Sequence, residues 1–159
     1  PITALREPVS RLDEVGRVVV NGPGQDRAGA IRMVIEPVAV VSLGDGSRRP
    51  LSDLAGREVV AAAAIGNPER FFAMLRSHGL TVESRTLPDH ARFTPARAGL
   101  GSGKPVLLTE KDAVKCERAG WDGAAWVEVE PRIDTAGAAA LVDAIVHAAA
   151  GRTGDLKRD

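Results

Sequence analysis

The sequence has few aromatic residues and a single cysteine. Phe, Trp and Tyr make up 3% of its 159 residues, and Tyr is absent. A hydrophobic core must therefore be built from Ala, Val, Leu and Ile, which suits packed layers of sheet and helix. The lone Cys116 cannot form an internal disulfide, and the residues around it show no nucleophile or zinc pattern. We expect a reducing compartment, with Cys116 as a small buried filler and no metal site.

The sequence also lacks an excess of charge of either sign, and it has no long apolar run. Lys and Arg number 21, as do Asp and Glu, so no net field would attract nucleic acid. No apolar run reaches the ~20 residues of a membrane-spanning helix, and no signal-peptide pattern opens the chain. Hydrophobic residues make up 44%, a globular proportion. These features predict a cytosolic globular domain without a nucleic-acid partner.

Strand and helix patterns alternate after residue 50. The small-apolar run Glu58–Ile65 is typical of a strand covered on both faces. Asn67 and Pro68 can begin a helix that ends at Gly79, with Phe71 and Phe72 on its core-facing side. Further strands are predicted over 81–87, 105–108 and 125–129, and further helices over 109–118 and 135–151.

The first 50 residues are β-rich. We predict strands over 17–21 and 31–43, and Pro37 indicates that the second is an edge strand or breaks in two. The expected fold class is α/β: a layered, mostly parallel sheet with flanking helices, preceded by a short β-rich connector. The predicted divisions are the β-rich segment over residues 1–50, an α/β domain over 51–151 and a polar tail over 152–159. Because the chain opens without Met, cap or strand pattern, we interpret it as a fragment or a processed product.

The segment Gly101–Lys104 has the composition of a phosphate-binding loop but not its pattern. That loop requires a Gly five residues before its second Gly, and a Ser or Thr after the Lys. Ala98 and Pro105 occupy those positions, and the segment precedes a strand instead of following one. We predict a plain loop.

His90 is the histidine placed best for chemistry. It follows a predicted strand together with Asp89 and Arg92, at the end of the sheet where α/β proteins gather ligands. Such a cluster can relay protons or steady a phosphoryl oxygen, although an ordinary turn has the same composition. His78 and His147 lie on helices without acidic or cysteine clusters and are predicted to be structural.

Two further positions are candidate binding residues. Lys111 lies at the start of a helix that follows a strand, where backbone N–H groups favour an anion. The capping-box pattern of Thr109 and Asp112 accounts for those two neighbours. Arg6 and Glu7 form an ionisable pair just before a rigid proline.

Four segments resemble those of one enzyme family, in the family's order. Leu5–Leu12 (LREPVSRL) is similar to L-R-E-P-L-S-R-L, and Ala64–Phe72 (AIGNPERFF) to G-I-G-N-P-E-R-F-F. Leu87–Phe93 (LPDHARF) is similar to F-P-D-H-H-x-F, and Val106–Lys115 (VLLTEKDAVK) to V-L-M-T-E-K-D-A-V-K. The resemblance covers the chain from about Leu5 to about Val129. The chain is identified as similar to the C-terminal part of the tetraacyldisaccharide 4'-kinases of lipid A biosynthesis.

The resemblance implies a P-loop-kinase-like fold and transfer of the ATP γ-phosphoryl to the 4'-hydroxyl of tetraacyldisaccharide 1-phosphate. It implies that His90, paired with Asp89, assists an acidic base, and that Arg6, with Glu7, lines the cleft. Leu87 replaces the motif's Phe and Ala91 its second His. ATP and Mg²⁺ are expected to bind in an N-terminal half that this sequence does not include.

Further expectations follow from the resemblance. The enzyme is expected to be peripheral at the cytoplasmic face of the inner membrane, with membrane contact through the missing half. The partners are the lipid A precursor and that half, and this chain alone is expected to be inactive. An alternative interpretation is a truncated, non-catalytic module that binds nucleotide, lipid or another protein.

Overall fold

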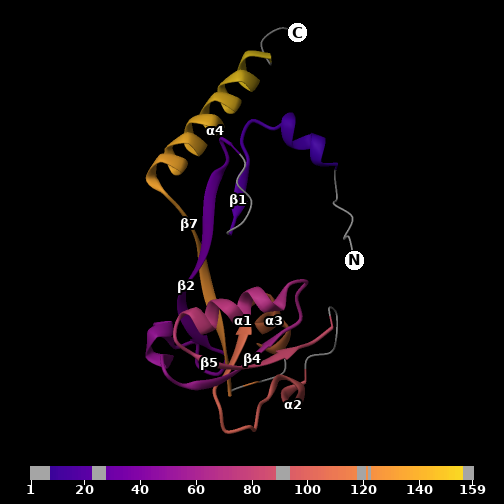
Figure 1. Ribbon diagram of the computed structural model, residues 1–159, viewed down its shortest axis with the longest axis vertical. Coiled ribbons are helices and arrows are strands. Elements are labelled where there is room, and N and C mark those ends of the chain that lie inside the picture. Colours follow the sequence, from indigo (N-terminus) through magenta and orange to yellow (C-terminus); the bar gives the residue numbers. More distant parts are fainter. Residues whose placement is uncertain (1–7, 23–27, 89–93, 118–120, 122, 156–159) are drawn as a thin grey trace. The chain divides into compact units, whose positions relative to one another are not determined.

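A computed structural model describes residues 8–22, 28–88, 94–117, 121 and 123–155 (Figure 1). The chain divides into two compact units, Pro37–Glu130 and a smaller unit of Pro1–Glu36 with Pro131–Asp159. Two strands, β2 (Ile31–Ser42) and β7 (Ala124–Ile133), pass from one unit into the other. The boundary falls directly before a proline in both strands, Pro37 in β2 and Pro131 in β7. β2 nevertheless runs through Pro37 as one strand and has sheet neighbours on both sides, so neither the predicted break nor the predicted edge strand is found.

The larger unit is a layered α/β structure. Within this unit the strand order is β2, β7, β6 (Val106–Thr109), β4 (Glu58–Ala63) and β5 (Thr81–Thr86), and β3 (Arg48–Arg49) pairs with β2. The neighbours β7, β6, β4 and β5 are parallel, whereas the short β3 is antiparallel to β2. The predicted class, a mostly parallel sheet with flanking helices, is confirmed. The elements of this unit, besides β2 and β7, are β3 (Arg48–Arg49), the 3-10 helix η2 (Leu51–Leu54), β4 (Glu58–Ala63), α1 (Pro68–Ser77), β5 (Thr81–Thr86), α2 (Pro95–Ala98), β6 (Val106–Thr109) and α3 (Glu110–Glu117).

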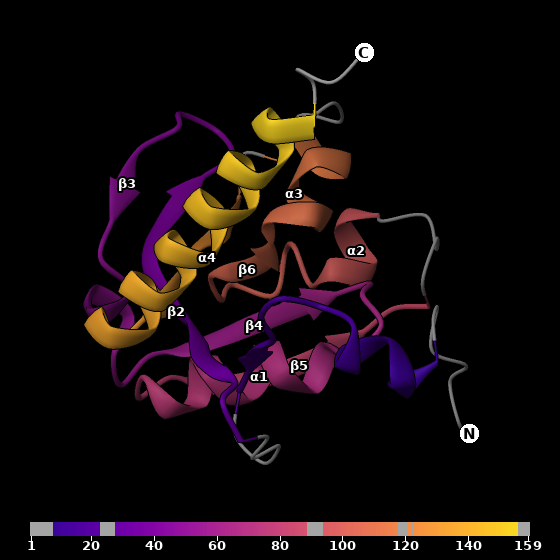
Figure 2. The ribbon, with the colours of Figure 1, turned by 90° about the horizontal axis from the view of Figure 1, so that it is seen from above.

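The central strand β4 is covered on both faces, as its composition predicts. Side chains alternate across a strand, so Val59 and Val60 enter different cores. Val59 lies in the core that includes Phe72 and Leu75 of α1, and Val60 in the one that includes Cys116 of α3. In Figure 1, α1 lies on one side of β4 and β5 with α2 on the other, and in Figure 2 α1 runs along these two strands.

Helix α1 begins after Asn67, as predicted, but not through the predicted side-chain cap. Asn67 occupies the N-cap position without a side-chain cap hydrogen bond. Pro68 follows in the first turn, where its missing N–H leaves no partner unsatisfied. Phe71 and Phe72 are both buried, which confirms that this helix face belongs to the core. The chain leaves the helix at Gly79, whose φ of +83° is a conformation that glycine adopts without steric cost.

The smaller unit combines two parallel strands with one long helix. β1 (Val19–Asn21) pairs with β2 so that Val19 lies opposite Ile31, and a 3-10 helix, η1 (Val9–Asp13), precedes it. Helix α4 (Thr135–Asp155) continues through Gly151, so the predicted helix end at Gly151 is too early. A glycine inside a helix costs about 1 kcal/mol, too little to terminate a helix of this length.

None of the helices in the described part of the chain has the length and hydrophobicity needed to cross a membrane.

Candidate functional site

The carboxyl ends of β4, β5 and β6 form the candidate site. These three strands are parallel neighbours, so the segments that follow them leave from the same edge of the sheet. Ligands of open α/β sheets bind at this edge. The name carboxyl-end rim is used below for the described residues there, which are Ala64–Asn67, Leu87–Pro88 and Thr109–Asp112.

Asp112 is the only buried charged or polar residue among those the structure describes, with 0% of its surface exposed. Its Oδ2 accepts hydrogen bonds from the Ala64 N–H at 2.9 Å and from the Thr109 hydroxyl at 2.8 Å. Its Oδ1 forms an ion pair with Lys115 Nζ at 2.9 Å. The carboxylate therefore ties together the ends of β4 and β6 and the first two turns of α3.

The capping interpretation of Thr109 and Asp112 was correct but incomplete. The Asp112 N–H donates to Thr109 Oγ1 at 3.3 Å, as expected of a helix cap. The bond from Ala64, 48 residues earlier in the sequence, could not be inferred from a local pattern. A sequence pattern that could have suggested this bond is the end of a buried strand, together with an acidic residue just after a neighbouring strand.

A second backbone contact joins β5 to β4 at the rim. The Leu87 N–H donates to the Ala63 carbonyl at 2.9 Å, one residue beyond the end of β5. Ala63 is the last residue of β4, and its carbonyl belongs to the same peptide group as the Ala64 N–H. One peptide group thus accepts from Leu87 and donates to Asp112.

Three polar residues of the rim are exposed, namely Asn67, Glu110 and Lys111. Lys111 lies in the first turn of α3, where its ammonium group can meet an anion beside the helix N-terminus. Asn67 is exposed at the N-cap of α1, and its amide makes no cap bond. The sequence pattern had assigned Asn67 to capping, a hydrogen bond that its side chain does not form.

The remaining predicted site residues, Arg6, Glu7, Asp89 and His90, lie outside the described residues. His90 follows Leu87 by three positions in the sequence.

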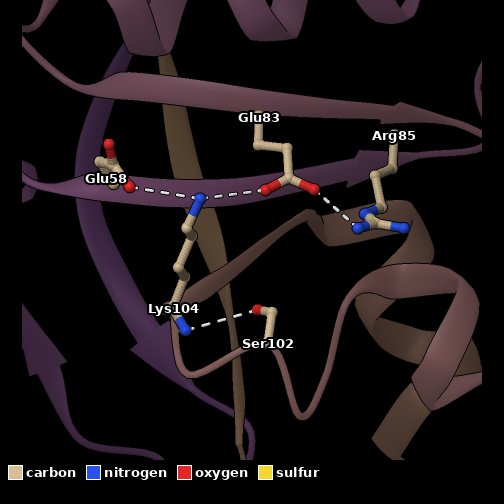
Figure 3. A network of polar contacts seen from close by, with 5 residues as sticks. All are labelled: Glu58, Glu83, Arg85, Ser102 and Lys104. Atoms are coloured by element: carbon tan, nitrogen blue, oxygen red, sulfur yellow. Dashed lines mark hydrogen bonds and ion pairs between the residues drawn. The ribbon is translucent and has the colours of Figure 1, made fainter.

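The segment Gly101–Lys104 is a loop before β6, as predicted, and its lysine is engaged in ion pairs. Lys104 Nζ lies 3.2 Å from a carboxylate oxygen of Glu58 and 3.2 Å from one of Glu83 (Figure 3). The hydrogen bond from Lys104, followed by that from Arg85, lowers the pKa of Glu83. Hydrogen bonds to Glu83 and Glu58 in turn raise the pKa of Lys104. The lysine therefore serves a surface ion-pair cluster and no phosphate cradle.

His78, His147 and Cys116 have the structural roles predicted for them. His78 Nδ1 lies 2.9 Å from the Met74 carbonyl, and His147 Nδ1 lies 2.9 Å from the Asp143 carbonyl, one turn earlier in each case. Cys116 is fully buried, and burial together with the nearby Asp112 carboxylate raises the pKa of its thiol to about 11. A thiol of this kind is a poor nucleophile at neutral pH.

No cluster of three or more His, Cys, Asp or Glu side chains that could hold a metal ion occurs within the described ranges.

Comparison with known proteins identifies relatives of this chain. Residues 1–147 match the family described as tetraacyldisaccharide-1-P 4'-kinase. A tetraacyldisaccharide 4'-kinase of Pseudomonas aeruginosa (strain LESB58) is 43% identical over 117 residues, which cover 73% of this chain and 35% of that protein. The enzyme of the same name from Nitrosococcus oceani is 37% identical over 149 residues, which cover 94% of this chain and 44% of that protein.

A solved structure has a similar fold. The crystal structure of LpxK from Aquifex aeolicus in complex with ATP superposes with a TM-score of 0.60 and 23% sequence identity. The match covers 90% of this chain and 45% of the LpxK chain. This chain therefore spans less than half the length of each of these three relatives. From the family match over residues 1–147, we conclude that the chain belongs to the tetraacyldisaccharide 4'-kinase family.

Proposed function

We propose that this chain is the C-terminal portion of a kinase that transfers the γ-phosphoryl group of ATP to the 4'-hydroxyl of tetraacyldisaccharide 1-phosphate. The observation that carries the proposal is the family match over residues 1–147, which includes all four sequence segments described above. The ATP-bound state of the LpxK crystal structure supports ATP as the phosphoryl donor.

The sequence indicates which steps of the proposed reaction this chain would not carry out. No segment has the G-x-x-x-x-G-K-[ST] pattern that cradles nucleotide phosphates. The nucleotide and Mg²⁺ would therefore be held by a part of the kinase outside this sequence. This agrees with the 35–44% of the two curated relatives that the chain spans.

The residues of this chain would act on the acceptor side of the reaction. Phosphoryl transfer depends on positioning and on cations beside the developing charge. We propose that Lys111, from the carboxyl-end rim, and Arg6, with Glu7, bind the phosphorylated sugar head group. His90, with Asp89, would hydrogen-bond an acidic base and keep it charged and oriented toward the 4'-hydroxyl.

The smaller unit supports the proposal that more protein packs against this chain. Its exposed large apolar side chains far outnumber its buried ones, of which Ile31 is the only example among its described residues. A domain normally buries most of its large apolar side chains. We propose that the nucleotide-binding part covers them. The enzyme would be peripheral at the cytoplasmic face of the inner membrane, in contact with lipid through that other part.

The test of the catalytic role is a substitution in the complete kinase. We expect His90→Ala to lower kcat by ~10²-fold or more, the usual contribution of a general acid–base group. His78→Ala and His147→Ala are matched controls, because both imidazoles are bonded to carbonyls of their own helices, and they should leave kcat unchanged. A His90→Ala enzyme with the parent kcat would reject the proposed role.

The alternative is a non-catalytic module that binds nucleotide, lipid or protein, and the missing phosphate-loop pattern favours it for this chain in isolation. Transfer of ³²P from ATP to the lipid acceptor separates the two. We expect no transfer by the 159-residue chain alone, and transfer by the chain within the complete kinase. A complete kinase that fails to phosphorylate the acceptor would favour the module.

A further inference from the structure

We propose that Asp112 is a positioning residue, whose buried carboxylate fixes the peptide group on which the Leu87 exit of β5 is anchored. The inference rests on the proposed function, because the segment that leaves β5 at Leu87 carries His90. It adds a role that neither helix capping nor the family motif assigns to Asp112.

The burial of Asp112 sets it apart from an ordinary capping residue. The side chain is fully buried, although a carboxylate removed from water loses its hydration. Three donors compensate this loss: the Ala64 N–H, the Thr109 hydroxyl and the Lys115 ammonium group, all within 2.9 Å. A helix cap requires only the local bond with Thr109, so the long-range bond to Ala64 calls for a separate explanation.

The bond to Ala64 is the first link of a continuous path. Asp112 Oδ2 accepts from the Ala64 N–H at 2.9 Å. The Ala63 carbonyl, on the other side of the same planar peptide group, accepts from the Leu87 N–H at 2.9 Å. Rotation of this peptide would move the donor and the acceptor together, so the carboxylate that holds one end also fixes the other.

The charge of Asp112 contributes more than its shape. Hydrogen bonds to an ionised acceptor are stronger than those between neutral groups, and bonds in series polarise one another. Asn in the same place could still accept from the Ala64 N–H. The same oxygen could accept from the Thr109 hydroxyl, but the NH₂ group would take the place of Oδ1 and could not accept from the Lys115 ammonium group. Asp112→Asn therefore loosens the path with little change of volume.

These hydrogen bonds lie at the carboxyl-end rim, where the proposed reaction would take place. Ala63 ends β4 and Ala64 follows it, Leu87 follows β5, and Thr109 ends β6, so one carboxylate sets the relative positions of three strand exits. A catalytic group displaced by about 1 Å can lose on the order of 10²-fold in rate. Asp112 would act through the backbone without touching substrate.

The test combines NMR of the 159-residue chain with kinetics of the complete kinase. We expect Asp112→Asn to shift the amide proton resonances of both Ala64 and Leu87 and to speed their hydrogen exchange. In the complete kinase it should lower kcat about 10-fold or more, with KM for ATP nearly unchanged. Thr109→Val, which removes one donor at the same oxygen, should produce smaller shifts in the same directions and covers the case in which Asp112→Asn fails to fold.

Leu75→Ala is the matched control for a loss of stability alone. Leu75 is fully buried in α1, in the core on the other face of β4, and lies outside the hydrogen-bond path. It should lower Tm at least as much as Asp112→Asn while the Leu87 resonance and kcat stay near their parent values.

Two results would overturn the inference. In one, the Leu87 resonance and exchange rate stay unchanged in Asp112→Asn and Thr109→Val. In the other, kcat falls as far in Leu75→Ala as in Asp112→Asn. Failure of the proposed function is distinguishable, because an unchanged kcat in His90→Ala rejects the role of His90 while the NMR result still tests the path.

Discussion

At the scale of single residues, Gly99 and Gly101 have the same backbone conformation but different surroundings. They therefore allow the cost of a left-handed φ to be compared with the cost of a steric clash. Their φ values are +91° and +90°, so an alanine at either position adopts the same unfavourable left-handed conformation. A Cβ on Gly99 would lie 2.7 Å from Val60 Cγ1, inside a packed core, whereas one on Gly101 meets nothing within 4 Å.

The pair yields a direct prediction about stability. Gly101→Ala should lower the free energy of unfolding by about 1–2 kcal/mol, the cost of the left-handed conformation. Gly99→Ala should lower it by roughly 1–3 kcal/mol more, because the clash with Val60 adds an overpacking cost. Urea denaturation of both variants measures the difference, and equal losses would contradict the core contact of Gly99.

Burial of the Cys116 thiol makes the stability of the fold depend on pH. Its pKa is about 11 in the folded chain, against 9.0 for an unperturbed thiol, so the unfolded chain loses the proton first as pH rises. The stabilisation is complete below pH 9 and is lost as pH rises to about 11. Two pKa units correspond to about 3 kcal/mol as an upper estimate.

The measurement compares the parent chain with Cys116→Ala by urea denaturation between pH 8 and pH 11. The parent should lose stability more steeply over this range than the variant. Iodoacetamide should also modify the native thiol far more slowly at pH 8 than the thiol of the unfolded chain. Rapid modification of the native chain would show that the thiol is not held in its buried, protonated state.

At the scale of elements, patterns with a short period could be predicted and long-range contacts could not. The small-apolar run of β4 and the spacing of Phe71 and Phe72 reflect which faces are covered, so they predicted strand, helix and core. Asp112 illustrates the limit. Its partner Thr109 lies three residues away and was found, whereas its partner Ala64 depends on which strands are neighbours in the sheet.

The helix starts of α1 and α2 allow a prediction about two N-cap residues. Thr94 caps α2 through a hydrogen bond from the Arg97 N–H to its hydroxyl at 3.4 Å, whereas Asn67 at the start of α1 makes no such bond. We expect Thr94→Ala to destabilise the chain by about 0.5–1 kcal/mol and Asn67→Ala by less. Thermal unfolding of the two variants measures the difference.

A functional role of the Asn67 amide would appear in the kinetics of the complete kinase. Asn67→Ala should raise KM for the lipid acceptor, and Thr94→Ala should not. If Asn67→Ala instead lowers the free energy of unfolding strongly, Asn67 acts as a helix cap and does not belong to the candidate site.

At the scale of the whole molecule, the family could be recognised from the sequence, but four of the candidate site residues could not be placed. The four segments carry enough specific residues to identify relatives, and the parallel sheet follows from the alternation of strands and helices. Arg6, Glu7, Asp89 and His90 lie outside the described residues, so their roles remain predictions. The local patterns that predict strands and helices do not say where residues between these elements lie.

The apolar surface of α4 gives the prediction that belongs to this scale. Val142, Ile145 and Val146 are 58–60% exposed and lie within five residues of one helix. On a helix they share one face, because residues three and four apart are neighbours. An exposed apolar patch of this kind is typical of an interaction site.

We expect the double substitution Val142→Lys and Ile145→Lys to act differently in the chain and in the complete kinase. In the 159-residue chain these side chains already face water, so the variant should keep its Tm and bind less of the hydrophobic dye ANS. In the complete kinase the lysines would have to be buried against the nucleotide-binding part, and Tm and activity should both fall. His147→Lys is the matched control, because it adds a cation at an exposed position of the same helix. If the complete kinase tolerates the double substitution as well as the control, this face of α4 is not where the rest of the enzyme packs, and the apolar strand residues Val19 and Val34 become the next candidates.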